Sequence, residues 1–274
     1  MLDDAFFAPF RAGLEAAQRS FSARFPGDSG ARQPVSVLYG GAQLFSEDTP
    51  RKLGALALRA LREFAPDAPT FGAAFGLSAP LAPQVYARVL AKLERAPLED
   101  LRIDFEDGYG HRSDEEEDGH ARAAGEAYAR AALPPFSGLR VKPLSAELGE
   151  RAVRTLSLFL APLPAVPPGF VVTLPKVVSV AQVTLFVSAL AALERARGWA
   201  PGTLRFEVMV EAAQGLVDEA GRALLPQVMA AADGRLRGAH FGAYDYTASL
   251  GLAASAQTLH HPACDVARAQ LQLA

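Results

Sequence analysis

The sequence has little of several features that mark large classes of proteins. Its 274 residues include one cysteine, Cys264, so no internal disulfide can form, which fits a reducing compartment. No charge-free run of about 20 apolar residues occurs, which argues against a membrane-spanning helix. The net charge is −3 and the pI is about 6.0, so the basic surface of a nucleic-acid-binding protein is missing. We expect a cytoplasmic protein without nucleic-acid or membrane partners.

Three common cofactor motifs are also missing. The chain has no G-x-G-x-x-G, no Walker A sequence and no H-E-x-x-H, so dinucleotide, P-loop and zinc-peptidase sites have no support. The N-terminus carries Asp3 and Asp4, where a signal peptide carries positive charge. Phe6, Phe10 and Leu14 follow at helical spacing and predict an amphipathic helix over residues 1–25.

The sequence does contain a repeating pattern of short apolar runs and helical segments. Predicted strands start near residues 35, 101, 139, 170, 204 and 237, with predicted helices between them. Residues 70–75 form either a seventh strand or an Ala/Gly-rich loop. Such alternation is typical of a parallel sheet, whether open or closed into a barrel. At 274 residues, the chain is long enough for one α/β barrel or two smaller domains.

The last third of the chain predicts a strand–helix–strand unit. Phe206–Val210 and residues 239–241 are short apolar runs, and residues 216–232 have apolar side chains at helical spacing. A helical crossover makes the two strands parallel, and the ends of neighbouring strands lie about 5 Å apart. Glu211 and Asp245 each come just after a strand. Two carboxylates at that separation suit one Mg²⁺ with open positions for water or substrate.

These two acids also have a simpler interpretation. Glu211 would cap the following helix, and Asp245 would be an ordinary loop residue, because strand ends in α/β folds carry polar residues anyway.

Charged residues follow three other predicted strands. Glu106 and Asp107 follow the second strand, Arg140 and Lys142 end the third, and Lys176 follows the fourth. Arg140 and Lys142 are two residues apart, so on a strand both point to the same side. Inside a barrel they need an anionic partner, which the neighbouring acids supply. Alternatively, Arg140 forms a structural ion pair with Glu106.

A run of acids at residues 114–118 follows Ser113. Ser113 and Glu116 predict a capping box at the start of a helix. Acids in a first helical turn complement the helix dipole, so we expect a mainly structural role for this run.

Five short motifs occur in order between residues 101 and 251. They are similar to the LED, VRVN, LPKV, ET-x-x-G and G-x-x-D-L motifs of the HpcH/HpaI aldolase and citrate lyase β-subunit family, within the phosphoenolpyruvate/pyruvate-binding barrels. Here the motifs read FEDG at 105–108, LRVK at 139–142, LPKV at 174–177, EAAQG at 211–215 and GAYDY at 242–246. The family's late HP-x-Q strand has no counterpart, and residues 1–100 match only loosely.

The resemblance implies a TIM-type (β/α)₈ barrel that is incomplete at its C-terminus in this chain. We expect a single domain over residues 1–274, with an N-terminal helix at 1–25 and an insertion near residues 66–83. We also expect a homo-oligomer, either a dimer, a trimer or a hexamer.

The resemblance also assigns roles to residues. It implies that Glu211 and Asp245 hold Mg²⁺, with Mn²⁺ as a possible substitute. It also implies that Arg140, Glu106 and Asp107 are catalytic, with Arg140 contacting the substrate and the two acids beside the metal or its waters. The expected substrate-binding residues are Arg140, Lys142, Lys176 and Gly242. His111 is expected in a surface loop and His240 in a core or pocket position, so no histidine is assigned as the proton carrier.

A divalent cation beside an arginine, without an obvious nucleophile, suits a metal-stabilised enolate. We therefore expect a carbon–carbon lyase of aldol or Claisen type, acting on a 2-oxo acid or an acyl-CoA-derived hydroxy acid, with a CoA thioester as a possible part of the substrate. Two alternatives remain open: a non-catalytic barrel or scaffold subunit that binds a metal and a carboxylate, and a Mg²⁺-dependent thioester hydrolase.

Overall fold

The computed structural model describes residues 2–274, which divide into two compact units at residues 35 and 36. The first unit contains α1 (Asp4–Arg24), which confirms the predicted N-terminal helix. Asp3 caps this helix by accepting a hydrogen bond from the main-chain N–H of Phe6 at 3.2 Å. Met1, part of the predicted helix, lies outside the described residues.

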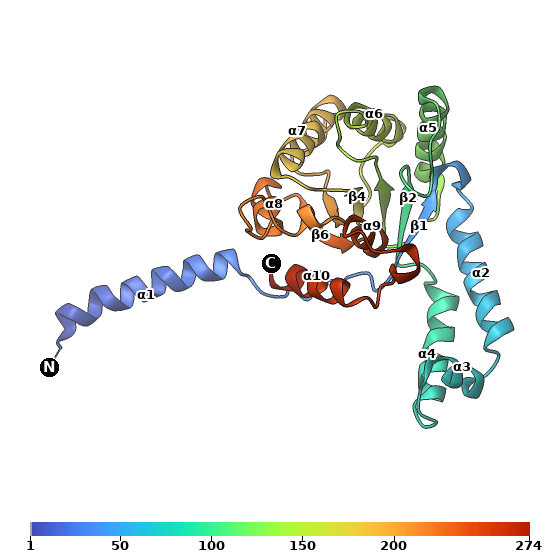
Figure 1. Cartoon of the computed structure of the whole chain (residues 1–274), viewed down its shortest axis with the longest axis horizontal. Helices are drawn as coiled ribbons and strands as arrows, with labels where there is room; N and C mark the ends of the chain where they lie inside the picture. The colour runs from blue at the N-terminus through green and yellow to red at the C-terminus, as the bar shows by residue number, and fades with distance from the viewer. Residues whose placement is uncertain (1) are drawn as a thin grey trace. The chain divides into compact units, whose positions relative to one another are not determined.

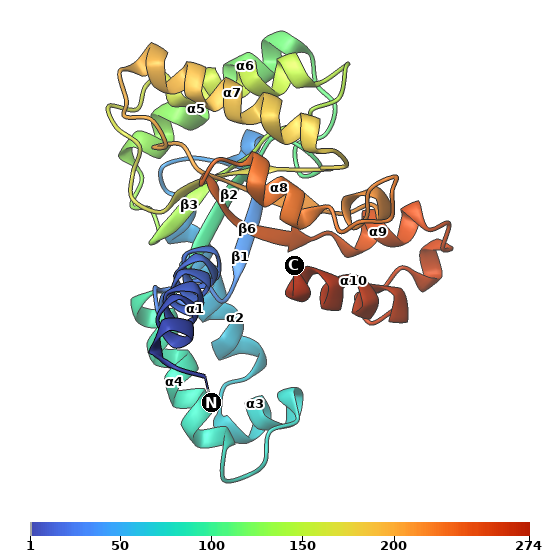
Figure 2. The ribbon, with the colours of Figure 1, turned by 90° about the vertical axis from the view of Figure 1, so that its left-hand side faces the viewer.

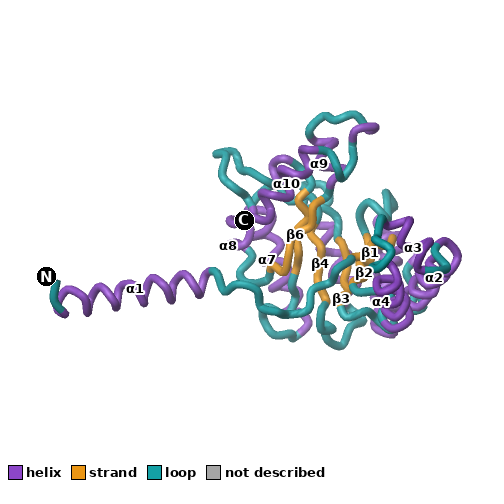
Figure 3. The backbone as a smooth tube through the Cα atoms, turned by 90° about the horizontal axis from the view of Figure 1, so that it is seen from below, coloured by secondary structure: helices purple, strands orange, loops and turns teal. Residues whose placement is uncertain are grey.

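The second unit is built on six parallel strands in the order in which they occur along the chain. Figure 3 shows these strands side by side. The predicted strands are confirmed, with small shifts at some ends. Their bounds are β1 (Val37–Gly41), β2 (Asp100–Asp104), β3 (Phe136–Arg140), β4 (Phe170–Leu174), β5 (Phe206–Val210) and β6 (Leu236–Phe241).

Helices connect the strands and return the chain to the same end of the sheet, as parallel pairing requires. Figure 1 shows α5, α6 and α7 on the outer side of the sheet, and Figure 2 shows α2 and α4 side by side. Among the described residues, no helix combines the length and apolar character needed to cross a membrane. The helices are α2 (Thr49–Phe64), α3 (Ala68–Phe75), α4 (Ala82–Arg95), α5 (Asp114–Arg130), α6 (Gly149–Leu160), α7 (Val180–Arg197), α8 (Leu225–Ala231), α9 (Ala243–Ser249) and α10 (Pro262–Leu273).

The sheet is strongly curved but does not close. Tyr39 on β1 reaches across the inner side of the sheet, and its hydroxyl donates to Glu207 Oε1 on β5 at 3.4 Å. The Tyr39 ring also lies 6.0 Å from the ring of His240 on β6. In the described chain, β1 and β6 are the two edges and do not pair with each other. The architecture is an incomplete parallel α/β barrel, as predicted.

The two sides of the sheet differ in chemistry because side chains alternate along each strand. Ile103, Leu139, Val172 and Val208 are buried and belong to one large apolar cluster. Helix side chains complete this cluster, among them Tyr128, Leu156, Phe159 and Phe186. Burial of this apolar surface holds the helices against the sheet.

The inner side of the sheet carries a buried polar network. Arg102 donates to both carboxylate oxygens of Asp100, at 2.7 and 2.6 Å, and one amino group lies 3.3 Å from Glu207. Glu207 also accepts from the Thr173 hydroxyl at 2.5 Å and contacts His240 Nε2 at 3.1 Å. Charges buried this deeply are tolerated only when they are paired, as they are here.

Residues 70–75 are helical, so both alternatives considered for them, a strand and a loop, are wrong. The segment forms α3, and the side chain of Asp67 caps it by accepting from the Thr70 N–H at 2.8 Å. Gly76 ends the helix with a φ of 65°, a left-handed conformation that glycine adopts at low cost. The predicted insertion at residues 66–83 therefore contains a capped helix, and the strand count is six.

The predicted helix over residues 216–232 is wrong in its first half. The side chain of Asp218 accepts from the main-chain N–H groups of Ala220 and Arg222, at 2.9 and 2.8 Å. Val217 and Ala223 form an isolated antiparallel bridge around this turn. Because an aspartate side chain competes with the helical hydrogen bonds, only α8 remains helical.

The acidic run at 114–118 is only partly solvent-exposed. Ser113 caps α5 by accepting from the Glu116 N–H at 3.2 Å, as predicted for half of a capping box. Glu117 and Asp118 are buried. Glu117 accepts from the Thr155 hydroxyl at 2.6 Å, and Asp118 pairs with Arg151 at 2.8 Å. The run therefore joins α5 to α6, a structural role that depends on pairing as well as on the helix dipole.

A buried ion pair at the amino ends of the strands yields a stability prediction. Both amino groups of Arg235 contact the Glu194 carboxylate, at 2.6 and 2.8 Å, and Glu194 also accepts from the Leu204 N–H at 2.7 Å. Arg235→Met should lower the free energy of unfolding by about 3–5 kcal/mol, because it leaves a buried carboxylate without its cation. Urea denaturation measures this loss.

The matched control is Arg268→Met, which removes an arginine from an exposed pair with Asp265. Such a pair contributes about 0–1 kcal/mol. A loss in Arg235→Met as small as that of the control would contradict the proposed importance of the buried pair.

Candidate active site

The two acids predicted to share a metal ion follow neighbouring strands. β5 and β6 pair in parallel, with Val210 opposite Phe241, and the Gly242 N–H donates to the Val210 carbonyl at 2.9 Å. Glu211 follows β5 directly. Asp245 lies in the first turn of α9, three residues after Gly242. The predicted pairing of the two strands is confirmed, and it brings both acids to the carboxyl end of the sheet.

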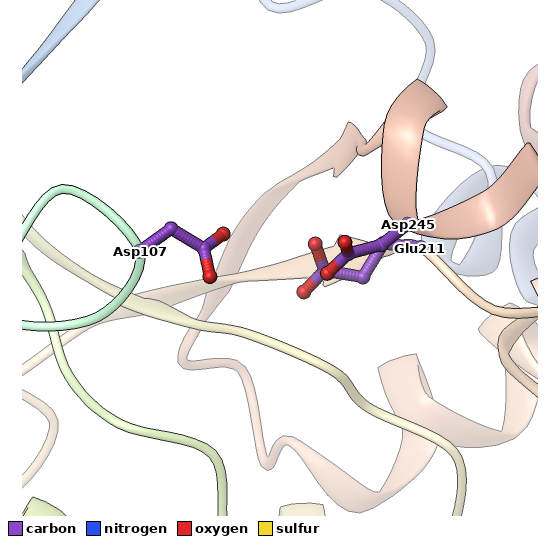
Figure 4. A group of neighbouring side chains, drawn as sticks. All are labelled: Asp107, Glu211 and Asp245. Atoms are coloured by element: carbon purple, nitrogen blue, oxygen red, sulfur yellow. The ribbon is translucent and has the colours of Figure 1, made fainter. Parts of the chain in front are cut away.

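A third carboxylate joins them from the loop after β2. Carboxylate oxygens of Asp107, Glu211 and Asp245 all lie within 4.8 Å of one another. Figure 4 shows Glu211 and Asp245 next to each other, with the Asp107 carboxylate facing them from the opposite side. We call these three residues the acid cluster. Asp107 was expected beside the metal or its waters, and its carboxylate lies close enough to the other two to act as a third ligand.

The acid cluster fits a hard divalent cation such as Mg²⁺ or Mn²⁺. All three donors are carboxylates, the ligands that Mg²⁺ prefers in proteins. Asp245 Oδ2 is buried, and the group that contacts it in the described structure is the Lys176 ammonium, at 2.9 Å. A buried carboxylate oxygen is costly unless a cation lies nearby.

Glu211 is the most deeply buried member of the cluster. It is 4% exposed, and its Oε1 accepts from the main-chain N–H of Lys176 at 2.7 Å. Burial raises the pKa of Glu211 to about 7, although the positive charge of Lys176 and this hydrogen bond act in the opposite direction. A cation bound at the cluster would favour the ionised carboxylate.

Gly242 lies against Glu211. A Cβ atom added at Gly242 would be 2.6 Å from Glu211 Cβ and 2.8 Å from its Oε2. Gly242, predicted as a substrate-binding residue, therefore also determines where the Glu211 carboxylate lies.

Lys176 places its ammonium group among the acids. Its Nζ lies 2.9 Å from Asp245 Oδ2 and 3.4 Å from Asp107 Oδ1, and it also hydrogen-bonds Glu106 Oε1. The residue has a φ of 51°, which is uncommon for a residue with a side chain. This backbone conformation accompanies the N–H bond to Glu211, so Lys176 contacts the site through both its main chain and its side chain.

Arg140 is buried at the end of β3 and surrounded by acids. Its guanidinium forms a two-point contact with Asp104, at 2.7 and 2.5 Å. Its Nη1 lies 3.0 Å from Glu106 and 3.4 Å from Asp107. Burial alone lowers the pKa of Arg140, but the hydrogen bond with Asp104 and the three negative charges outweigh it and raise the pKa. Arg140 therefore stays charged.

Asp104 is the residue that the sequence interpretation missed. Besides Arg140, its carboxylate accepts from the main-chain N–H groups of Glu106 and Gly108, at 3.0 and 2.8 Å. These bonds fold the loop that carries Glu106 and Asp107. The signal was an aspartate inside a predicted strand, two residues before Glu106, where an apolar residue would be the default.

The pKa values of the two acids in this loop, Glu106 and Asp107, are shifted in opposite directions. Burial raises the pKa of Glu106, against the opposing effects of Lys176 and Arg140. Burial also acts to raise the pKa of Asp107, but a hydrogen bond with Glu106 and the charges of Lys176 and Arg140 lower it overall. Asp107 is therefore the more readily ionised of the pair and the better cation ligand.

Lys142 lies apart from Arg140. β3 ends at Arg140, so strand alternation does not extend to Lys142. The Lys142 ammonium donates to the Phe105 carbonyl at 3.0 Å and lies 3.3 Å from Glu117 on α5. The structure brings together Glu106, Asp107, Arg140, Lys176, Glu211, Gly242 and Asp245, whereas Lys142 contacts the helix layer.

A cavity of about 750 Å³ adjoins the acid cluster. Glu106, Asp107 and Lys176 form part of its wall. The remaining wall comes from the following loop, α5 and α6, and includes both charge signs: Arg112, Asp114, Glu117, Lys142, Arg151 and Arg154. The cavity suits a polar ligand.

The histidines do not enter the acid cluster. His111 lines the cavity. His240 contacts Glu207 in the inner polar network, as expected for a satisfied pocket histidine. His120 Nδ1 lies 2.7 Å from the Tyr109 hydroxyl.

Comparison with known proteins agrees with this incomplete-barrel architecture. The chain belongs to the protein family described as domain of unknown function DUF6986, which matches residues 14–274. A search of the curated proteins found no match to this sequence.

Among solved structures, the chain is similar in fold to a citrate lyase from Burkholderia xenovorans LB400. The identity is 19% and the TM-score 0.51, covering 68% of this chain and 55% of that chain. Haloferax volcanii malate synthase in a lead(II) complex matches with 17% identity and a TM-score of 0.47, covering 71% and 55%. The present chain thus spans 55% of the length of either protein.

Gly242→Ala should weaken metal binding because the new methyl group would displace Glu211. Loss of correct ligand orientation typically costs roughly 10–100-fold in metal affinity. Isothermal titration with Mn²⁺ measures the change. Gly238→Ala is the matched control, since Gly238 lies on β6, the strand that Gly242 follows, and an added Cβ would have no neighbour within 4 Å. Equal affinities in the two variants would refute the role of Gly242.

The raised pKa of Glu211 predicts a pH dependence. Its folded pKa of about 7 exceeds the ordinary 4.5, so its contribution to stability is present below about pH 4.5 and is lost as the pH rises through about 7. Because a metal ligand must be deprotonated, Mn²⁺ affinity should rise from about pH 5 and level off above about pH 7. Calorimetric titration across this range tests the prediction. A constant affinity in the wild type would contradict it.

Proposed function

We propose that the protein is a Mg²⁺-dependent enzyme that makes or breaks a carbon–carbon bond. The reaction would be of aldol or Claisen type, run through an enolate, and use a 2-oxo acid or an acyl-CoA-derived hydroxy acid. The observation that carries this proposal is the convergence of three carboxylates, Asp107, Glu211 and Asp245, beside the cationic side chains of Arg140 and Lys176.

The carboxylates of the acid cluster would hold the metal ion. Bound there, Mg²⁺ supplies positive charge for the oxygen on which an enolate places its negative charge. Gly242 keeps Glu211 in position, and the adjoining cavity would hold the rest of the substrate.

Arg140 supplies a permanent positive charge next to the acids. It is anchored on Asp104 through two nitrogens, and its Nη1 is directed at the loop of Glu106 and Asp107. A guanidinium held this rigidly orients a planar carboxylate better than a flexible ammonium would. Arg140 would therefore orient the substrate once the acids engage the metal.

The sequence motifs support the same function. Five motifs resembling those of the HpcH/HpaI aldolase and citrate lyase β-subunit family occur in order between residues 101 and 251. All five motifs contribute to the site. The first four contribute one residue each, Asp107, Arg140, Lys176 and Glu211, and the fifth contributes both Gly242 and Asp245. The Burkholderia citrate lyase shares the fold.

A second candidate function is non-catalytic binding of a metal and a carboxylate. It is favoured by the many contacts of Arg140, which already pairs with Asp104, Glu106 and Asp107. An arginine so fully paired has less capacity to bind a substrate. Mg²⁺-dependent hydrolysis of a thioester is a third possibility that the same acids would serve.

Thermal shift assays test the binding step. Pyruvate, oxaloacetate or glyoxylate should raise the melting temperature when Mg²⁺ is present, because the carboxylate and carbonyl oxygens of a 2-oxo acid can chelate the ion. At about 100-fold excess over Kd, the expected shift is about 5–10 °C. The shift should disappear with EDTA and in Asp245→Asn. Stabilisation that survives EDTA would exclude the proposed chelate.

Product analysis then distinguishes the candidate functions. A lyase breaks a carbon–carbon bond of a hydroxy-oxo acid or a hydroxyacyl thioester and releases two carbon fragments, whereas a thioester hydrolase releases the thiol and the free acid with its carbon skeleton intact. Arg140→Lys should reduce this turnover about tenfold or more, because a point charge does not reproduce the guanidinium geometry. Metal-dependent ligand binding without any product would favour the non-catalytic function.

A further inference from the structure

Lys176 shares its carboxylate partners with the proposed metal ion. Its ammonium contacts Asp245 Oδ2 at 2.9 Å and Asp107 Oδ1 at 3.4 Å, and it hydrogen-bonds Glu106. Glu211, the remaining member of the acid cluster, accepts the main-chain N–H of the same residue. A single lysine therefore contacts every carboxylate of the cluster.

An ammonium and a divalent cation cannot use these oxygens together without strong repulsion. Two like charges a few ångströms apart repel substantially in a partly buried site. Asp245 Oδ2 is buried, and the Lys176 ammonium at 2.9 Å is the cation that it contacts in the described structure. Metal binding to Asp107 and Asp245 therefore requires the ammonium to move away.

The cavity beside the acid cluster has room for a second position of the Lys176 side chain. The Lys176 side chain is 36% exposed and lines the cavity of about 750 Å³. Four methylene groups allow the ammonium to swing, while the main-chain bond to Glu211 holds the backbone. In the cavity, the ammonium would no longer be paired with the acid cluster.

We propose that Lys176 is an exchangeable cation. It neutralises the acid cluster until a divalent ion binds there, then moves into the cavity and binds a carboxylate of the substrate. This inference rests on the proposed function, because it takes the ligand to be an anionic 2-oxo acid. Metal binding would thereby create the anion site, and by reciprocity the anion would strengthen metal binding.

The first test compares metal affinities. Lys176→Met removes the competing charge at nearly constant length, so Mn²⁺ should bind about tenfold or more tightly than to the wild type. The metal-free variant should also melt at a lower temperature, because the acids lose their cation. Lys176→Arg keeps a positive charge and should not bind Mn²⁺ more tightly. Lys92→Met removes a lysine paired with Glu99 outside the site and should leave Mn²⁺ affinity unchanged.

The second test measures the coupling between metal and anion. In the wild type, saturating Mn²⁺ should strengthen the binding of pyruvate and glyoxylate, and this gain should shrink in Lys176→Met. Calorimetric titrations of each ligand with and without the other give the coupling from both directions, and the two values must agree.

The outcomes separate the two proposals. If the wild type binds Mn²⁺ but Lys176→Met binds it no more tightly, the exchange is refuted and the proposed function stands. If Lys176→Arg also gains affinity, the charge is not the cause and the exchange is again refuted. A wild type that binds no Mn²⁺ overturns the proposed function and the exchange together.

Discussion

The arrangement of side chains at the carboxyl end of the sheet depends on cations that neutralise its buried carboxylates. Five carboxylates gather there around two cations, the guanidinium of Arg140 and the ammonium of Lys176. Arg140 is held by Asp104 in a two-point contact, and this pair fixes the loop that presents the other acids. Because the negative charges outnumber the positive ones, the site can accept one more cation. The carboxylates are Asp104, Glu106, Asp107, Glu211 and Asp245.

The sheet was predictable from the sequence because its signals are local. Phe170–Leu174 and Phe206–Val210 are short apolar runs bounded by polar or small residues, and both are strands over the predicted residues. Their order along the chain and the helices between them specify parallel pairing. Once β5 and β6 are neighbours, the meeting of Glu211 and Asp245 follows from the geometry of the sheet.

Other features were not predictable, because they depend on contacts between distant residues or on competing side-chain bonds. The apolar spacing of residues 216–232 is helical, but Asp218 bonds the main chain of its own turn. The position of Lys142 depends on Glu117 of α5, and Lys176 contacts three separate segments, namely the loop after β2, the end of β5 and the first turn of α9. No pattern within a few residues of either lysine encodes these partners.

The inner polar network limits how far a ligand can enter the curved sheet. Arg102, Thr173 and Glu207 fill the inside of the curved sheet and are almost fully buried. A ligand that enters the site from the adjoining cavity therefore meets a layer of packed, paired side chains beyond the acid cluster. A ligand that enters through this cavity would leave past the same loops, so a product that lingers there would block the next substrate from entering.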